Sequence, residues 1–120
     1  MIELIVPWPD RDLFPNRKNG VQWAAYQKKK EAARFAGYSA AAGLAVDHKD
    51  LLSQEEIPLE ITFYSPDARH RDWDGLAGAI KNAIDGVCSG LGIDDKCFWP
   101  VTIKRSRDAA KKGYVTLKLG

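Results

Sequence analysis

The sequence predicts a single α/β (α+β) domain, in which a small mixed sheet of about four strands carries two main helices in the order β-α-β-α-β-β. Three observations predict it. The chain has 120 residues, which is typical of one domain and long enough to bury a core without disulfides or a metal. Residues 57–64 alternate between apolar and polar types, as a half-buried strand does. Residues 74–89 repeat apolar side chains at three- and four-residue steps, as an amphipathic helix does.

The N-terminal half is expected to contain one strand and one long helix. The opening segment, MIELIV, is apolar, and Pro7 and Pro9 end it because proline cannot donate to a sheet ladder. The helical segment is rich in Ala, Lys, Gln and Glu, and Gly37 is a candidate break within it. The expected elements are a strand at 1–6, a polar loop at 10–20, a helix at 21–42 and a polar loop at 46–56.

The C-terminal half is expected to contain the second helix and three strands. Ser65 and Pro66 end the strand at 57–64. The helix at 74–89 has a continuous apolar stripe that would hold it on the sheet, with Cys88 on its flank and in the core. The stripe consists of Leu76, Ala79, Ile80, Ala83, Ile84, Val87 and Leu91. The last two strands are expected at 96–106 and 113–119, joined by the basic loop RDAAKKG.

Composition argues against several classes of protein. No apolar run approaches the roughly 20 residues needed to cross a bilayer, so we expect no membrane contact. The N-terminus lacks the basic leader and long apolar core of a secretory signal. Cys88 and Cys97 suggest a reducing, cytoplasmic setting, and with His48 and His70 they match no zinc pattern. The net charge of +2 permits a nucleic-acid partner without requiring one.

Two short segments concentrate acidic residues. HRDWDGL places Asp72 and Asp74 two residues apart, and GIDDK adds Asp94 and Asp95. If the segments converge, two carboxylates about 4 Å apart repel by roughly 4 kcal/mol at an effective dielectric of about 20, so a proton or a cation must enter. Oxygen ligands without histidine or thiolate suit Mg²⁺, with Mn²⁺ as a substitute. Acidic residues beside basic ones therefore suggest metal-assisted phosphodiester chemistry.

These residues also have simpler interpretations. Asp74 begins the predicted helix and could serve as its N-cap. Lys81 and Asp85 share its outward stripe and could form an ordinary surface ion pair that contributes about 0.3–0.5 kcal/mol. The acidic pair at 94–95 could belong to a turn. Asp72 precedes the expected cap, so it is not needed in that role.

The compound pattern from Arg71 to Asp95 resembles the RusA-type endonucleases, small phage and prophage proteins that resolve Holliday junctions. The shared features are RDWDGL, a helix, DG at Asp85–Gly86 and then LGIDD. VPWP and GYVTLKL resemble the first and last strands of that family, so the likeness covers residues 1–120 as a single RusA-like domain. The resemblance implies a crossover junction endodeoxyribonuclease, a metal-dependent hydrolase that nicks four-way DNA junctions in recombination, repair or phage DNA processing.

The resemblance also implies roles for individual residues. Asp72, Asp74 and Asp95 would be catalytic and would bind Mg²⁺, with Asp94 beside them as a further ligand. The helix lysine of the family falls at Gly78 in this chain. Lys81, about one turn later on the same stripe, is the expected catalytic substitute near the phosphate. No small-molecule cofactor is expected.

Branched DNA and a second copy of the chain are the partners that the resemblance implies. A homodimer places two active sites about the same two-fold axis as a four-way junction. Basic residues in or beside loops are expected to contact DNA phosphates: Arg11, Arg17, Lys18, Arg69 and Arg71. Phe14 is expected either to stack at the junction or to anchor its loop. Trp73 is expected to pack beside the site and position its two aspartates, with direct base contact as the second interpretation.

Two other functions remain open. A catalytically degenerate relative would grip branched DNA without cutting it, and Gly75 and Gly78 favour this alternative because the family has asparagine and lysine there. A structural or interaction domain would use its acidic segments only to cap helices. Junction binding in a chelator, without nicking in any metal, would indicate the degenerate relative.

Overall fold

A four-stranded mixed sheet organises the fold in the computed structural model, which describes residues 1–15 and 22–120. The strands are β1 (Ile2–Pro7), β2 (Ile57–Ser65), β3 (Phe98–Arg107) and β4 (Tyr114–Leu119). Their order across the sheet is β1-β4-β2-β3, with β2 and β3 parallel and the other neighbours antiparallel. The predicted α/β fold class, with about four strands in a mixed sheet, is confirmed.

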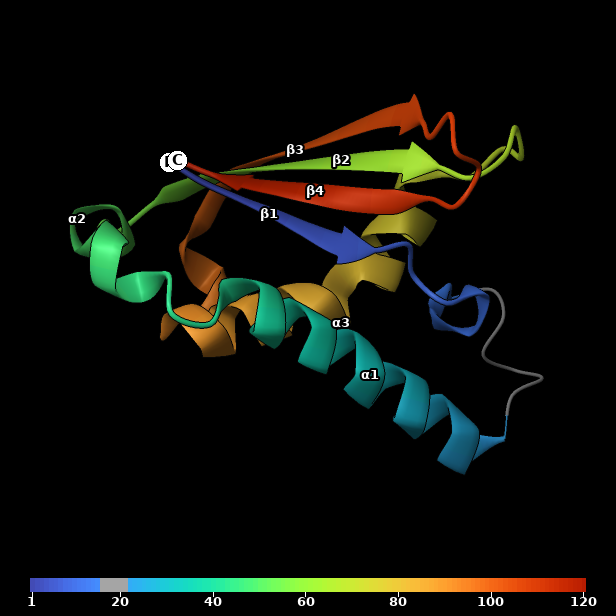
Figure 1. Cartoon of the computed structure of the whole chain (residues 1–120), viewed down its shortest axis with the longest axis horizontal. Coiled ribbons are helices and arrows are strands. Elements are labelled where there is room, and N and C mark those ends of the chain that lie inside the picture. The colour runs from blue at the N-terminus through green and yellow to red at the C-terminus, as the bar shows by residue number, and fades with distance from the viewer. Residues whose placement is uncertain (16–21) are drawn as a thin grey trace.

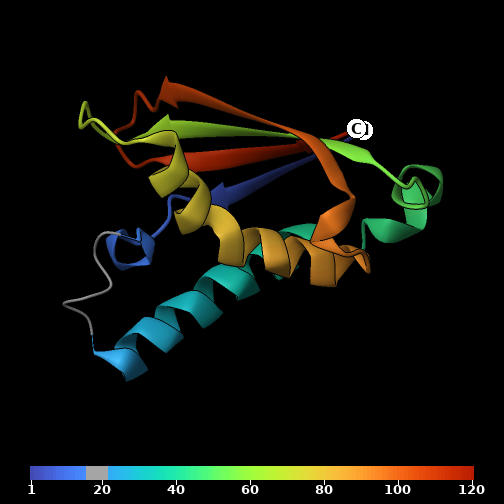
Figure 2. The same cartoon turned by 180° about the vertical axis from the view of Figure 1, so that it is seen from behind.

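Two long helices lie on one face of this sheet, and both views show them crossing beneath it (Figures 1 and 2). These helices are α1 (Trp23–Ala41) and α3 (Trp73–Leu91). α3 connects the parallel strands β2 and β3, and α1 packs mainly against α3. Every residue of the predicted apolar stripe of α3 is buried, as is Cys88 on its flank. Burial of this stripe against the sheet holds α3 in place.

Glycines allow the two helices to touch backbone to backbone. A Cβ added to Gly37 would lie 1.9 Å from the carbonyl oxygen of Ala83, and one added to Gly86 would lie 1.9 Å from the carbonyl oxygen of Arg34. No side chain fits at either distance. α1 runs unbroken from Trp23 to Ala41, so the helix has no break at the candidate position Gly37. Gly37 serves the helix crossing instead.

Short helical turns replace some of the predicted loop and strand ends. The polar loop expected at 46–56 is wrong, because η3 (Ala45–His48) and α2 (Lys49–Leu52) occupy most of it. The partly buried Leu51 and Leu52 pack against the core, which favours a helical turn there. The short helix η1 (Arg11–Leu13) follows β1, and η4 (Asp95–Cys97) precedes β3.

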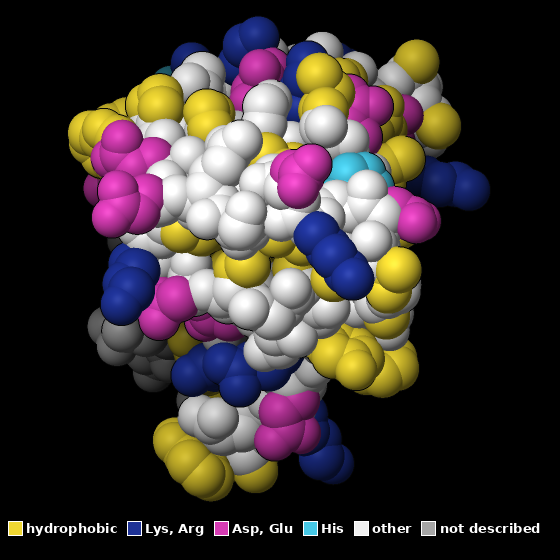
Figure 3. All heavy atoms as spheres, turned by 90° about the vertical axis from the view of Figure 1, so that its left-hand side faces the viewer, with side chains coloured by type: hydrophobic (Ala, Val, Ile, Leu, Met, Phe, Trp, Pro, Cys, Tyr) yellow, Lys and Arg dark blue, Asp and Glu magenta, His cyan; other side chains and the backbone are white. Residues whose placement is uncertain are grey.

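The molecule has two distinct ends. The two termini lie together at one end, near α2, and β2 and β3 end at the other, where α3 begins (Figures 1 and 2). On the face of the α2 end, acidic and basic side chains are interspersed (Figure 3). Within residues 1–15 and 22–120, no helix is both long and apolar enough to cross a bilayer.

Candidate functional site

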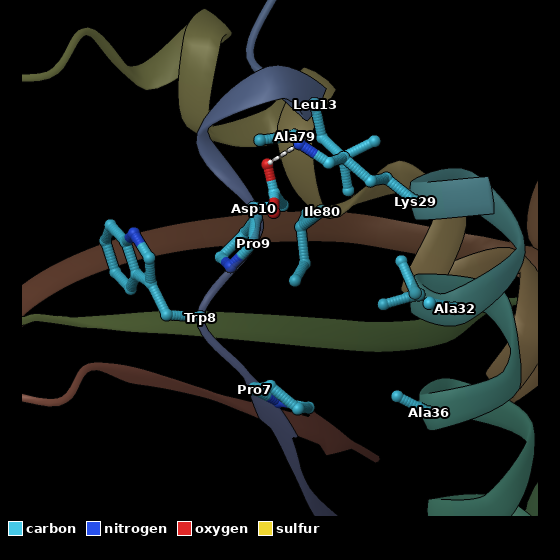
Figure 4. A pocket seen from close by; sticks show the side chains of 12 residues that line it. Pro7, Trp8, Pro9, Asp10, Leu13, Lys29, Ala32, Ala36, Ala79 and Ile80 are labelled. Carbon is cyan, nitrogen blue, oxygen red and sulfur yellow. Dashed lines mark ion pairs between the residues drawn. The ribbon is translucent and has the colours of Figure 1, made fainter. Parts of the chain in front are cut away.

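A largely apolar cavity of about 210 Å³ opens between the end of β1 and the two long helices (Figure 4). Its lining includes Pro7, Pro9, Ala32, Ala36 and Ile80. At its rim, the ammonium of Lys29 donates to the carboxylate of Asp12 and lies 3.3 Å from Oδ1 of Asp10. These contacts raise the pKa of Lys29. The cavity therefore offers apolar surface and a lysine already committed to two carboxylates, so we place the candidate site elsewhere.

Asp72 and Asp74 share a cavity of about 340 Å³ at the N-terminus of α3. Both residues are exposed, and 76% of the Asp72 side chain is open to solvent. The remainder of the lining comprises Phe14, Pro15, His70, Arg71 and Gly75. Two carboxylates therefore line one solvent-open cavity beside basic side chains.

Asp72, and not Asp74, occupies the N-cap position of α3, with φ −73° and ψ 151°. Its side chain makes no capping hydrogen bond, and its Oδ1 lies 3.2 Å from Nε2 of His70. Asp74 lies in the first turn, where the helix dipole favours a negative charge, and its Oδ1 accepts the N–H of Gly75 at 2.9 Å. The alternative interpretation of Asp74 as the N-cap is therefore wrong.

Lys81 joins the second acidic segment to the helix. Its Nζ donates to Oδ1 of Asp85 at 2.8 Å and to Oδ2 of Asp95. Burial by itself would lower the pKa of Lys81, but the hydrogen bonds to the two carboxylates outweigh it and raise that pKa. The hydrogen bond from Lys81 also lowers the pKa of Asp95. Arg34 also approaches this group, with its Nη2 3.9 Å from Oδ2 of Asp85. The ion pair considered within the helix is therefore part of a four-residue cluster.

The second acidic segment lies apart from the first. Asp95 accepts a hydrogen bond from Lys81. Lys81 follows Asp74 by seven residues on α3, which separates the two positions by about 10 Å along the helix axis. Asp94 is the N-cap of η4, and its Oδ1 accepts the N–H of Lys96 at 3.0 Å. Within residues 1–15 and 22–120, no three acidic, histidine or cysteine side chains form a group that could hold a metal ion. The structure thus brings Asp72 and Asp74 together and leaves Asp94 and Asp95 outside their cavity.

Arg71 holds the loop that leads into α3. Its Nη1 lies 3.0 Å from Oδ1 of Asp67, and its Nη2 lies 3.2 Å from Oδ2 of the same carboxylate. These hydrogen bonds lower the pKa of Asp67. The guanidinium also lies 5.0 Å from the ring centre of Trp8 and donates to Oγ of Ser65 at 3.0 Å. Because only 17% of the Arg71 side chain is exposed, most of its donors are committed to the loop.

The other predicted DNA-contact residues are spread over the chain. Arg69 is exposed in the same loop as Arg71, and its backbone N–H donates to Asp67 at 2.9 Å. Arg11, in η1, is 80% exposed, with its Nε 4.0 Å from Oδ1 of Asp12. Arg17 and Lys18 lie outside the described residues. Arg69 and Arg71 are therefore the members of this set that immediately precede the acidic pair.

The two aromatic residues near the acidic pair differ in burial. Trp73 is 68% exposed, so the expectation that it packs beside the site is wrong. Its position directly after the N-cap leaves the indole outside the apolar stripe of α3. Phe14 is partly buried and packs against the core, which matches its interpretation as a hydrophobic anchor.

Two arginines at the end of β3 were missed by the reasoning from sequence. Arg105 and Arg107 line a cavity of about 220 Å³ that also includes Arg69, His70 and Arg71. The available signal was KRSR, in which the strand places a basic residue at every second position after Ile103. His70 and Arg71 belong to the linings of this cavity and of the one that holds the acidic pair, so the two cavities adjoin.

No family model matches the chain. A protein of Xylella fastidiosa (strain Temecula1 / ATCC 700964) is 33% identical over 98 residues, which make up 82% of this chain and 63% of that protein. The chain therefore spans less than two thirds of the length of this relative. That protein is described as uncharacterized, so the similarity assigns neither an activity nor a partner.

Proposed function

We propose that the protein is a Mg²⁺-dependent, structure-selective DNA endonuclease of the RusA type, which resolves four-way junctions by paired hydrolysis of phosphodiesters. The observation that carries this proposal is the shared cavity of Asp72 and Asp74 beside a second cavity rich in arginine. An acidic pair alone would repel a phosphodiester, and neighbouring basic side chains offset that repulsion. His70 and Arg71 line both cavities and so connect the two charged regions.

Asp72 and Asp74 fit the ligand preference of Mg²⁺. This ion is usually bound through one or two carboxylates, with waters and substrate phosphates completing its shell. Both side chains are exposed, and Asp72 makes no capping bond that would compete. When bound, the cation would supply stabilisation of the charge that builds on the phosphate. Participation of Asp95 as a further ligand requires its contact with Lys81 to open.

The remaining proposed roles belong to basic side chains and to a second copy of the chain. Arg69 would hold a DNA phosphate near the acidic pair, and Lys81, once released by Asp95, would stabilise charge on a phosphate. Arg71 would act mainly by fixing the loop through Asp67. Paired incision of a junction needs two active sites, so we propose a homodimer, which light scattering at assay concentration checks.

The rival function is a degenerate relative that binds branched DNA without cutting it. Two observations favour it. Lys81 already neutralises Asp95, and Asp95 lies outside the cavity of Asp72 and Asp74. A Cβ at Gly78 would lie 2.8 Å from Cγ of Pro15, so the lysine that the family has there would need Pro15 to move.

Cleavage of a synthetic four-way junction tests the proposal. The wild type should nick the junction with Mg²⁺ or Mn²⁺ and not in EDTA, and Asp74→Asn should lower the rate by at least about a hundredfold. Asp47→Asn is the matched control, because Asp47 is an exposed aspartate in η3, outside the acidic pair's cavity. Its rate should equal that of the wild type.

Failure to cut has two distinct meanings in this experiment. A wild type that shifts the junction in EDTA but never nicks it in either metal would establish the degenerate binder. A wild type that neither binds nor cuts the junction would remove both proposals and leave the acidic segments with a structural role only.

A further inference from the structure

The cavity at the end of β3 is unusual because arginines line it on the face of the sheet that is otherwise apolar. Side chains alternate between the two faces of a strand, and residues paired across a ladder share a face. Ile103 pairs with Ile61, Arg105 with Phe63, and Arg107 with Ser65. Ile61 and Phe63 are buried under the helices, so Arg105 and Arg107 lie on the helix-covered side. The same strand face therefore changes from apolar to basic where the sheet ends.

The arginines that line this cavity carry more positive charge than the carboxylate in its lining neutralises. Four arginines line it, and Asp67 is the one carboxylate in its lining. Asp67 is bound on both oxygens by Arg71. Within residues 1–15 and 22–120, no carboxylate forms an ion pair with Arg69, Arg105 or Arg107. Nη1 of Arg105 donates to the carbonyl oxygen of Arg71 at 3.2 Å. A guanidinium has five N–H donors, so Arg105 can donate to a further acceptor as well.

The position of the cavity suits an anionic ligand. Its lining residues come from the ends of the parallel strands β2 and β3 and from the loop that leads into α3. Figures 1 and 2 show that these strands end where α3 begins. In open α/β sheets, ligands bind in the crevice outside the carboxyl ends of such strands. Ser65 also lines the cavity, but its hydroxyl already donates to the carbonyl oxygen of Asp67 at 2.7 Å, so the arginines carry the argument. Guanidinium groups form charge-assisted, often bidentate hydrogen bonds to phosphate oxygens.

We infer that this cavity binds a backbone phosphate of DNA, one that flanks the phosphodiester held at the acidic pair. The inference rests on the proposed function for the identity of the DNA, and on the charge and geometry of the cavity for the phosphate. Arg107 and Arg69 supply guanidinium groups that have no ion pair among the described residues. Arg105, on β3, adds a third positive charge to the cavity. Because His70 and Arg71 line both this cavity and that of Asp72 and Asp74, a DNA strand bound here would pass next to the acidic pair.

A different use of these arginines is the protection of a sheet edge. β3 is an edge strand, and inward-pointing charges on such strands oppose edge-to-edge association. Either sign of charge serves that purpose, whereas a phosphate needs a positive one. Arg107→Glu therefore separates the two roles, since it keeps the edge charged and repels the anion.

The experiment combines titration with inorganic phosphate, followed by backbone amide NMR, and binding of a labelled four-way junction in EDTA. In the wild type, phosphate should shift the amides of residues 69–71 and 105–107. Arg107→Gln and Arg107→Glu should abolish these shifts while leaving the other amides in place, which shows that the fold persists. Lys111→Gln is the matched control, because it removes the same charge from the loop after β3 without touching the cavity lining.

Junction affinity gives the second readout. Arg107→Gln should weaken binding about tenfold and reduce the slope of log affinity against log salt by about 1, and Lys111→Gln should leave both nearer to the wild-type values. Arg107 variants that match Lys111→Gln in the phosphate titration or in junction binding would overturn the inference, even if the wild type cuts junctions. Phosphate shifts in a wild type that neither binds nor cuts junctions would instead remove the proposed function and keep the cavity as an anion site.

Discussion

The ammonium group of Lys81 binds the carboxylate of Asp95, which lies fourteen residues further along the chain. This contact ties η4 to the outward side of α3, just after Gly92 ends the helix with a φ of 73°. Asp95 is not part of the lining of the cavity shared by Asp72 and Asp74. This ion pair therefore joins η4 to α3 and occupies one of the four aspartates of the two acidic segments.

Replacement of Lys81 should release Asp95. In Lys81→Met, the pKa of Asp95 should rise toward its usual range, because the hydrogen bond that lowers it is lost. The loss of the contact should cost about 0.5–1 kcal/mol, as expected for a largely exposed pair. Carboxyl-detected NMR titration measures the pKa. Lys28→Met, which removes an exposed lysine of α1, should leave it unchanged.

Acid should weaken the same contact in the wild type. Since the pKa of Asp95 is lowered in the folded protein, its contribution to stability is present above the usual carboxyl range of about pH 4 and is lost as the pH falls through the lowered value. Lys81 behaves in the opposite sense, because its pKa is raised and its contribution is lost only as the pH rises through that raised value. Urea unfolding measures the free energy of unfolding between pH 2 and pH 6. This free energy should fall less steeply toward low pH in Lys81→Met than in Lys28→Met. Parallel curves would contradict this account.

The helix crossing should tolerate no side chain at its contact points. Gly86→Ala should lower the free energy of unfolding by about 3 kcal/mol or more, because its Cβ would fall 1.9 Å from a backbone oxygen of α1. Gly75→Ala is the matched control in the same helix, with nothing within 4 Å of the new Cβ. It should raise stability by about 0.5–1 kcal/mol through helix propensity. Urea denaturation measures both, and similar effects of the two variants would refute the close crossing.

The loop before α3 should depend on arginine chemistry at one position. Arg71→Lys loses the bidentate hydrogen bonds to Asp67 and the guanidinium contact with the Trp8 ring, and the loss of the ring contact alone should cost about 1 kcal/mol. Arg69→Lys, in the same loop but without an ion pair among the described residues, should unfold like the wild type. Equal unfolding midpoints for the two variants would show that Arg71 does not hold the loop.

The two thiols should differ in reactivity. Burial raises the pKa of Cys88 to about 12, so about 10⁻⁴ of it is thiolate at pH 8. Cys97 is only partly buried. With an aromatic disulfide reagent, we expect one thiol to react in the native protein and the second only as it unfolds. Cys97→Ser, which leaves Cys88, should show only the slow reaction, and Cys88→Ser, which leaves Cys97, should show only the fast one. The opposite result would contradict the burial of Cys88.

Much of the fold is predictable from local pattern. The alternation at 57–64 and the apolar stripe of α3 depend on repeats of two and of three to four residues, which the buried residues of β2 and α3 match. The region at 46–56 has no such repeat, and packing of Leu51 and Leu52 on the core decides its helical turns. Gly37 illustrates the same limit, because glycine permits either a helix break or a close crossing, and only the neighbouring helix distinguishes them.

For the candidate site, the sequence by itself determined that Asp72 and Asp74 lie at the start of a helix and share one neighbourhood, since they are two residues apart. The tertiary structure decided where Asp95 goes, because its partner Lys81 is on the far side of a helix end and a turn. It also decided that Arg105 and Arg107 reach the loop of Arg69, because parallel pairing of β2 with β3 is a contact between segments some forty residues apart. Contacts of that range depend on how the chain closes on itself, and no local repeat encodes them.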